Sequence, residues 1–110
     1  MAHKYNARKT AIDGITFDSL KEAGRYQELK LAERAGIIEG LTLKPRFTLQ
    51  PGFSDNQGNR IRAITYTADF QYMENGRSVV EDVKGFETKT WNIKKKIFLY
   101  LYPEHILRIT

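Results

Sequence analysis

Three residues have the types and spacing of a metal-dependent hydrolytic site: Asp69, Asp82 and Lys84. Between the aspartates lies Asn75-Gly76, a dipeptide typical of a two-residue type I′ hairpin turn. Counting outward from such a turn places Asp69 opposite Asp82 as a non-hydrogen-bonded pair, with Cα atoms about 4.5 Å apart. The sequence therefore predicts two carboxylates pointing from one face of a hairpin into the same small volume.

Like charges directly opposite each other destabilise a sheet, so this pair needs a cation. Strand alternation places Lys84 on the same face as Asp82, about 7 Å further along. The remaining negative charge suits a hard divalent ion with oxygen ligands. The other face of the hairpin is expected to meet the core, with Glu81 as a polar exception among Ala68, Phe70, Val79 and Val83.

A third carboxylate comes from an expected helix. Ser19 and Glu22 have the spacing of a capping box, and the following run ends at Gly36, a residue suited to the position after a helix. At 100° per residue, Glu22 shares a face with apolar Tyr26 and Leu29. Glu22 therefore faces the protein, either as a partner of the aspartates or only as the reciprocal half of the capping box.

The elements that would position these residues follow from turn signals and periodicity. We expect a hairpin over 9–17 around Asp13-Gly14, a helix over 20–35 and extended chain over 38–50 interrupted by Pro45. A polar loop over 51–59, strands over 61–73 and 77–83, a helix over 89–101 and a strand over 106–109 complete the chain. The order hairpin-α-β-β-β-α-β predicts an α/β (α+β) fold with a mixed central sheet flanked by two helices.

Composition limits the class of protein. The 110 residues suit a single domain over 1–110, and the absence of cysteine excludes disulfides and cysteine-based metal or nucleophile chemistry. No apolar run is long enough to span a bilayer, and the polar, basic start does not look like a secretory signal, so we expect a cytoplasmic protein without membrane contact. A net charge of +5 favours a polyanionic partner.

The residues that carry this chemistry resemble the PD-(D/E)XK nuclease superfamily, which has the restriction-endonuclease-like fold. The resemblance comprises Glu22, Asp69 in ADF, Asp82 and Lys84 in VVEDVKG, and the basic helix that follows, with Ala68 in place of the proline of the name. The sequence is also similar to a small phage-encoded family through KYNARKT, DGITFDS, KEAGRY, ADFQY and VVEDVKGFET. That second likeness covers nearly the whole chain.

The superfamily resemblance implies a metal-dependent endonuclease acting on phosphodiester bonds in DNA. Glu22, Asp69 and Asp82, with the backbone carbonyl of Val83, would hold Mg²⁺ or Mn²⁺. Lys84 would orient or help to deprotonate the attacking water and stabilise charge on the phosphate. The resemblance also implies a role in phage DNA recombination, repair or packaging.

Six residues are candidates for DNA contact. Residues 1–9 are expected to form a flexible basic arm that includes Lys4, Arg8 and Lys9. Thr88 and Lys89 lie near the start of the second helix, where backbone N–H groups attract phosphate. Lys94 lies in the Trp91, Phe98 and Leu101 stripe, where it either contacts phosphate or packs its stem inward.

So small a chain favours recognition of DNA shape, such as a branch or Holliday junction, by a homodimer presenting two sites. One alternative is a basic module that binds nucleic acid or another phage protein without cleavage. A second alternative is a purely structural or assembly role in which Asp69 and Lys84 form an ion pair.

Overall fold

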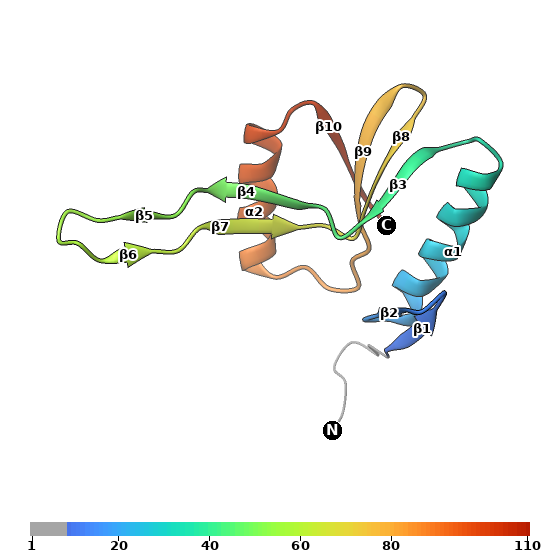
Figure 1. The fold of residues 1–110 in the computed structure, drawn as a ribbon, viewed down its shortest axis with the longest axis horizontal. Helices are drawn as coiled ribbons and strands as arrows, with labels where there is room; N and C mark the ends of the chain where they lie inside the picture. Colours follow the sequence, from blue (N-terminus) through green and yellow to red (C-terminus); the bar gives the residue numbers. More distant parts are fainter. Residues whose placement is uncertain (1–8) are drawn as a thin grey trace.

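A computed structural model describes residues 9–110, which form an α+β fold. The elements are β1 (Thr10–Ile12), β2 (Ile15–Phe17), α1 (Leu20–Arg34), β3 (Glu39–Leu43), β4 (Arg46–Gln50), β5 (Phe53–Ser54), β6 (Arg60–Ile61), β7 (Ile64–Thr67), β8 (Phe70–Glu74), β9 (Arg77–Asp82), α2 (Lys89–Leu101) and β10 (His105–Ile109). Figure 1 shows α1 and α2 on either side of a fan of strands.

The central sheet has the strand order β10-β9-β8-β3. It is mixed, because β10 runs parallel to β9 whereas the β8–β9 and β3–β8 pairs are antiparallel. Asn75 and Gly76 both have positive φ, at 52° and 74°, as a type I′ turn requires. The β8–β9 register runs from Glu74↔Arg77 to Phe70↔Glu81, as the turn predicts. Regular pairing stops one residue before Asp69.

Each face of this sheet packs against one helix. Neighbouring residues of β9 divide between the faces: Val79 lies in the cluster with Tyr26 and Leu29 of α1, and Val80 lies with Trp91 and Phe98 of α2. Because alternate side chains of a strand point to opposite faces, one short strand contributes to both cores. The expected arrangement of two helices about a mixed sheet is therefore present in the described residues.

Glu81, the polar exception in the hairpin, is fully buried on the α1 side. Its carboxylate accepts hydrogen bonds from Arg25 (Nη2, 3.1 Å), Tyr72 and Thr110 (Oγ1, 3.0 Å). Burial alone would raise the pKa of Glu81, but the hydrogen bonds from Arg25 and Tyr72 hold that pKa below its ordinary value. Glu81 is thus an ionised carboxylate with its partners supplied inside the fold.

A bend divides two runs of extended chain: the 38–50 run, which Pro45 was expected to interrupt, and the 61–73 run, which was expected to be continuous. The 38–50 run breaks at Lys44-Pro45, between β3 and β4, and Lys44 has φ of +53°. The 61–73 run breaks into β6, β7 and β8, so Ala68 packs with Val80 on the α2 side instead of with Phe70. The bend occurs on both strands at one level, since Lys44 N–H donates to the Asp69 carbonyl at 3.0 Å.

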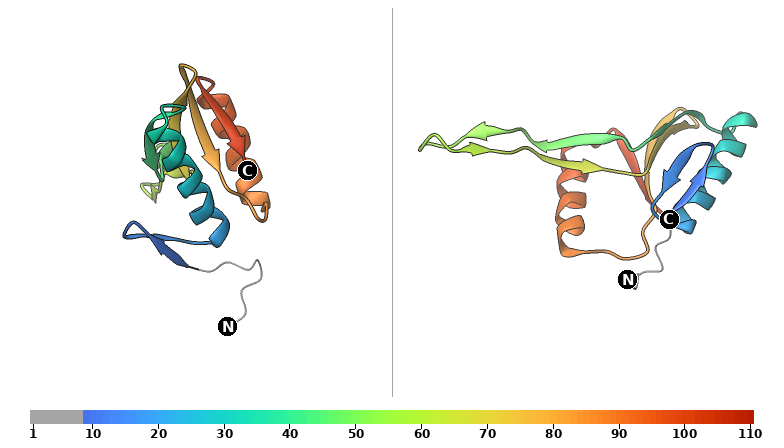
Figure 2. Two further views of the ribbon diagram at one scale, coloured as in Figure 1. Left: turned by 90° about the vertical axis from the view of Figure 1, so that its right-hand side faces the viewer. Right: turned by 60° about the horizontal axis from the view of Figure 1, so that its bottom comes forward.

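Beyond the bend the two strands continue outward together. β4 pairs with β7, and β5 pairs with β6, so the segment expected to be a polar loop over 51–59 instead contributes to a ribbon. This ribbon, residues 46–67, is called the β-arm below. Its distal half projects away from both helices in Figure 1 and in the right-hand view of Figure 2.

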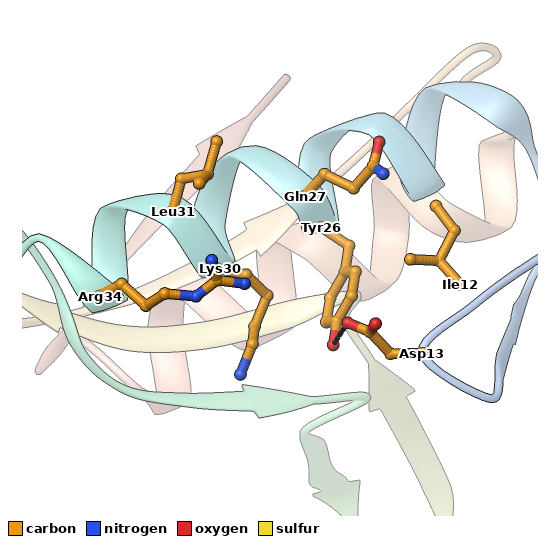
Figure 3. A pocket seen from close by; sticks show the side chains of 7 residues that line it. All are labelled: Ile12, Asp13, Tyr26, Gln27, Lys30, Leu31 and Arg34. Carbon is orange, nitrogen blue, oxygen red and sulfur yellow. Dashed lines mark hydrogen bonds between the residues drawn. The ribbon is translucent and has the colours of Figure 1, made fainter.

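The N-terminal hairpin rests against α1. Asp13 and Gly14 both have positive φ at its turn, and Asp13 accepts a hydrogen bond from the Tyr26 hydroxyl at 3.0 Å. Figure 3 shows this contact beside a hollow of about 210 Å³, with Lys30 and Arg34 on its border. No candidate site residue lines that hollow, so the hairpin serves here to cover one end of α1.

Candidate active site

Glu22 enters the site from the first turn of α1. Ser19 caps the helix by accepting the Glu22 N–H at 3.1 Å, so half of the expected capping box is present. The Glu22 carboxylate instead accepts a hydrogen bond from Lys44 Nζ at 2.9 Å, and its side chain is only 7% exposed. Burial is the main cause that raises the pKa of Glu22.

Asp69 lies at the bend between β7 and β8 and meets the same ammonium. Its Oδ1 accepts from Lys44 Nζ at 3.2 Å, and its Oδ2 accepts from the backbone N–H of Val83 at 2.7 Å. Asp18 lies further from Lys44 Nζ, at 4.0 Å. Carboxylates from helix α1 and from the β7–β8 bend therefore converge on one positive charge.

Lys44 is a residue of this site that the sequence analysis missed. Partial burial works against its charge, but hydrogen bonding to Glu22 and the nearby Asp69 outweigh burial and raise its pKa. Its side chain remains 47% exposed. The only sequence signal was the break before Pro45, which indicates an irregular strand but names no contact.

Asp82 ends β9 on the α2 side and is 2% exposed. Its Oδ2 accepts hydrogen bonds from the Tyr66 hydroxyl and from Trp91 Nε1 at 3.1 Å. Burial raises the pKa of Asp82 to about 6, and the neighbouring Asp69 carboxylate adds to the rise. Asp69 thus lies close enough to Asp82 to oppose its ionisation, although regular β8–β9 pairing ends at Phe70↔Glu81, before the Asp69–Asp82 pair that the turn predicts.

Lys84 lies next to Asp82, with Nζ 3.6 Å from Oδ1. The same ammonium lies 4.8 Å from the centre of the Trp91 ring, a cation–π distance. Hydrogen bonds also fix the main chain of Lys84. Its N–H donates to the Thr110 carbonyl, and its own carbonyl accepts from Lys21 Nζ at 3.2 Å. A purely structural role was expected to pair Asp69 with Lys84. The structure instead pairs Asp69 with Lys44 and Asp82 with Lys84.

A hollow of about 590 Å³ opens beside these groups. Glu22, Asp69, Val83 and Lys84 line it, and Lys21, Phe86 and Thr88 lie around them. Lysines that border a hollow with carboxylates inside it suit a polyanion whose phosphate enters the hollow. We call this space the catalytic hollow, after the role proposed for it below.

The donor chemistry of the site suits a divalent cation. Glu22 and Asp69 already point oxygen atoms at a single positive charge, and hard cations take such oxygen ligands. Within residues 9–110, however, no three His, Cys, Asp or Glu side chains form a ready-made metal cluster. Lys44 stands between two of the carboxylates, so an ion held by Glu22 and Asp69 would take the place of its ammonium.

Of the described residues predicted to contact DNA, Thr88 borders the catalytic hollow and the others do not line it. Thr88 caps α2, accepting the Trp91 N–H at 3.0 Å, and it also borders the catalytic hollow. Lys89 and Lys9 are exposed, and Lys94 is half-buried. Leu101, expected on the inward stripe of α2, is 43% exposed, because the helix ends there. Lys4 and Arg8 lie outside the described residues.

Comparisons with known proteins place the sequence in one family. Residues 2–110 match the family described as "Protein of unknown function (DUF1064)". A search of curated proteins finds no match. No helix of the described residues is long and apolar enough to cross a membrane.

Proposed function

The chain belongs to the DUF1064 family, and from the geometry of its site we propose that it is a metal-dependent endonuclease of the PD-(D/E)XK type that hydrolyses phosphodiester bonds in DNA. The observation that carries the proposal is the convergence of Glu22 and Asp69 on one cation, with buried Asp82 and Lys84 alongside. A core built only for stability has little reason to collect three carboxylates with two raised pKa values.

Glu22, Asp69 and Asp82, with the Val83 carbonyl, would hold Mg²⁺ or Mn²⁺. A bound ion of this kind polarises a phosphoryl oxygen and lowers the pKa of a water molecule. Tyr66 and Trp91 hold the Asp82 carboxylate in place through the hydrogen bonds described above. Such bonds fix the carboxylate before substrate arrives, which reduces the reorganisation that the reaction needs.

Lys84 would direct the attacking water and stabilise the charge that develops on the phosphate. Its ammonium is fixed between Asp82 and the Trp91 ring, so it needs little movement to meet a phosphate in the catalytic hollow. Because residues 9–110 form one small domain around this site, we favour recognition of DNA shape, with branched DNA or a Holliday junction as the substrate class. A homodimer would present two such sites to one junction.

The test is a cleavage assay on linear, nicked, flapped and four-way DNA in Mg²⁺, Mn²⁺ or EDTA. We expect metal-dependent cleavage that is strongest on branched DNA and is abolished in Asp82→Asn and Asp69→Asn, while DNA binding persists. Glu39→Gln, which removes an exposed charge from β3, is the matched control and should cut as the wild type does. Cleavage by Asp82→Asn at the wild-type rate would refute the proposal.

Lys44 supports a second candidate, a module that binds nucleic acid or a phage protein without cleavage. In that case the ammonium neutralises Glu22 and Asp69 permanently and no metal is needed. Calorimetric titration separates the candidates. A nuclease site binds Mn²⁺ saturably and loses that binding in Asp69→Asn, whereas a neutralised site shows no saturable binding in either protein.

A further inference from the structure

We infer that the β-arm is a DNA-binding ribbon which extends the contact with duplex by about one helical turn beyond the catalytic hollow. This inference deepens the proposed function and rests on it for the identity of the partner. The β-arm begins at the site itself, since Lys44 and Asp69 lie at the bend from which its two strands leave the central sheet.

The charge of the β-arm is suited to a polyanion. Residues 46–67 contain Arg46, Arg60 and Arg62 but a single acidic residue, Asp55. All three arginines are exposed. The Asp55 carboxylate is engaged in the tip turn, where it accepts hydrogen bonds from the N–H groups of Gln57 (2.9 Å) and Asn59 (2.8 Å). The surface of the ribbon is therefore dominated by positive charge.

The ribbon also has the dimensions of a groove-binding element. From Arg46 to the Asp55 turn it extends roughly 30 Å, at about 3.3 Å per residue. One turn of B-form DNA is about 34–36 Å long, and the major groove admits a two-stranded ribbon. Its distal half projects away from both helices in Figure 1 and in the right-hand view of Figure 2, which leaves it accessible to a duplex.

Local structure keeps the distal ribbon thin. A Cβ atom at Gly52 would lie 2.8 Å from Nη2 of Arg60, so the glycine lets that guanidinium lie close against the opposite strand. Phe53 pairs with Ile61 across the ribbon, and Phe53 is 43% exposed. An isolated two-stranded ribbon is only marginally stable in water, so a ribbon of this length gains order by binding a partner.

A groove of hydroxyl groups connects the catalytic hollow with the β-arm. It comprises a hollow of about 320 Å³ lined by four threonines, Lys94 and the rings below them: Thr65, Thr67, Thr88, Thr90, Tyr66 and Trp91. Thr88 also borders the catalytic hollow. Thr65, Thr90 and Lys94 border the next hollow, of about 410 Å³, which includes Ala63 and Ile64 of the β-arm.

Threonine hydroxyls and lysine are typical ligands of DNA phosphates. This threonine groove therefore supplies a continuous course for one strand of the backbone, from the scissile phosphate along α2 to the arginines of the β-arm. Two cations follow along the β-arm beyond this groove: Arg62 and Arg60 lie two and four positions before Ile64. Without the β-arm, contact with DNA would end near Lys94.

The test measures DNA binding in EDTA, where cleavage does not intervene. Fluorescence anisotropy with one-turn and two-turn duplexes is recorded at several salt concentrations for the wild type, Arg60→Gln/Arg62→Gln and a matched control, Arg34→Gln/Arg77→Gln. The control removes two exposed arginines from α1 and from the β8–β9 turn. A further variant replaces residues 52–61 by Asn-Gly, which shortens the ribbon and leaves the bend intact.

We expect the Arg60/Arg62 variant to bind the two-turn duplex roughly tenfold more weakly and to lower the salt slope by about 0.9 per lost contact. The shortened variant should lose the preference for the longer duplex. Wild-type affinity and slope in both variants would overturn the inference. A shortened variant that binds DNA normally but dissociates from dimer to monomer would overturn it too, because the partner would be a second copy.

Failure of this inference and failure of the proposed function are distinguishable. Cleavage abolished in Asp82→Asn, with normal DNA binding by the arm variants, would leave a nuclease without a DNA-binding arm. Weaker binding by the arm variants, in a protein that cuts under no condition, would support the arm and leave the non-catalytic module. Circular dichroism of each variant confirms that the fold is retained.

Discussion

Two neighbouring acids of β9, Glu81 and Asp82, are both buried yet have opposite electrostatic settings. Glu81 faces α1 and has its charge matched by Arg25, with Tyr72 and Thr110 as further donors, so its pKa is lowered. Asp82 faces α2 with a second carboxylate nearby and a more distant ammonium, so its pKa rises to about 6. One residue step along a strand thus separates a satisfied ion pair from an under-compensated one.

The two settings distinguish a buried charge that the fold already neutralises from one that an added cation would stabilise. A carboxylate with all its partners in place has nothing to gain from a ligand. A carboxylate whose ionisation the fold opposes gains stabilisation from any cation that arrives, and such groups gather at functional sites. Substitutions on either face of β9 test this difference between the two carboxylates.

The largest effect is expected from Arg25→Ala. It leaves the Glu81 carboxylate buried without its cation, and breaking a buried pair from one side costs about 3 kcal/mol or more. Urea unfolding at pH 7 measures the loss. Arg34→Ala, an exposed arginine of the same helix, should change the unfolding free energy by less than about 0.5 kcal/mol. Equal stability of the two variants would show that Glu81 does not depend on Arg25.

Asp82→Asn is expected to raise the unfolding free energy at pH 7, whereas Arg25→Ala lowers it. A group whose folded pKa exceeds its unfolded value of 3.8 holds its proton more tightly in the folded state. Between about pH 4 and pH 6 that group makes stability fall as pH rises, by at most about 3 kcal/mol for a shift of this size. Asp82→Asn should remove this decline and be the more stable protein at pH 7 in urea unfolding.

Glu81→Gln is the control for Asp82→Asn, because its effect on stability at pH 7 is expected to have the opposite sign. The lowered pKa of Glu81 means that its contribution is present at neutral pH and is lost as pH falls below about 4.5. Glu81→Gln should therefore be less stable than wild type at pH 7 and approach it in acid. If both variants shift stability in the same direction at pH 7, the contrast between the two acids is wrong.

The sequence was sufficient to predict features fixed by local geometry. The Asn75-Gly76 turn alone sets the register of β8 and β9 as far as Phe70↔Glu81, and the next residues along the two strands are Asp69 and Asp82. Ser19 and the apolar face of α1 set the direction of Glu22. Each of these inferences needs only residues within one turn, one hairpin or one helix.

Other features depend on contacts between distant parts of the chain, which local patterns do not encode. Arg25 meets Glu81 across 56 positions, and Lys44 meets Asp69 across 25. The bend at Lys44 and at Ala68 changes which side chains share a face, and it turns the segment expected as a loop into the β-arm. The sequence therefore predicted that Glu22, Asp69 and Asp82 lie together, but of the two lysines beside them it identified only Lys84.

Lys44→Met tests the missing cation. Without its ammonium, Glu22 and Asp69 repel each other, and we expect the unfolding free energy to fall by about 1 kcal/mol because the lysine side chain is half exposed. The same change should tighten Mn²⁺ binding roughly tenfold, since the ion no longer competes with a lysine. Calorimetry measures the affinity, with Lys30→Met as control on the far turns of α1. Unchanged or weaker binding would mean that Lys44 does not occupy the cation position.

The smallest effect on stability is expected from removing the tyrosine hydroxyl that meets a buried acid on each face of β9. Tyr66 donates to Asp82 and Tyr72 donates to Glu81, so Tyr66→Phe and Tyr72→Phe are a matched pair. Each should cost about 1 kcal/mol. In Tyr66→Phe the Asp82 carboxylate loses a donor that lowers its pKa, so carboxyl NMR should show that pKa above 6. In Tyr72→Phe the guanidinium of Arg25 remains and should keep Glu81 ionised at pH 6. Because the two hydroxyls are chemically alike, a difference between these titrations isolates what the cation contributes on each side of β9.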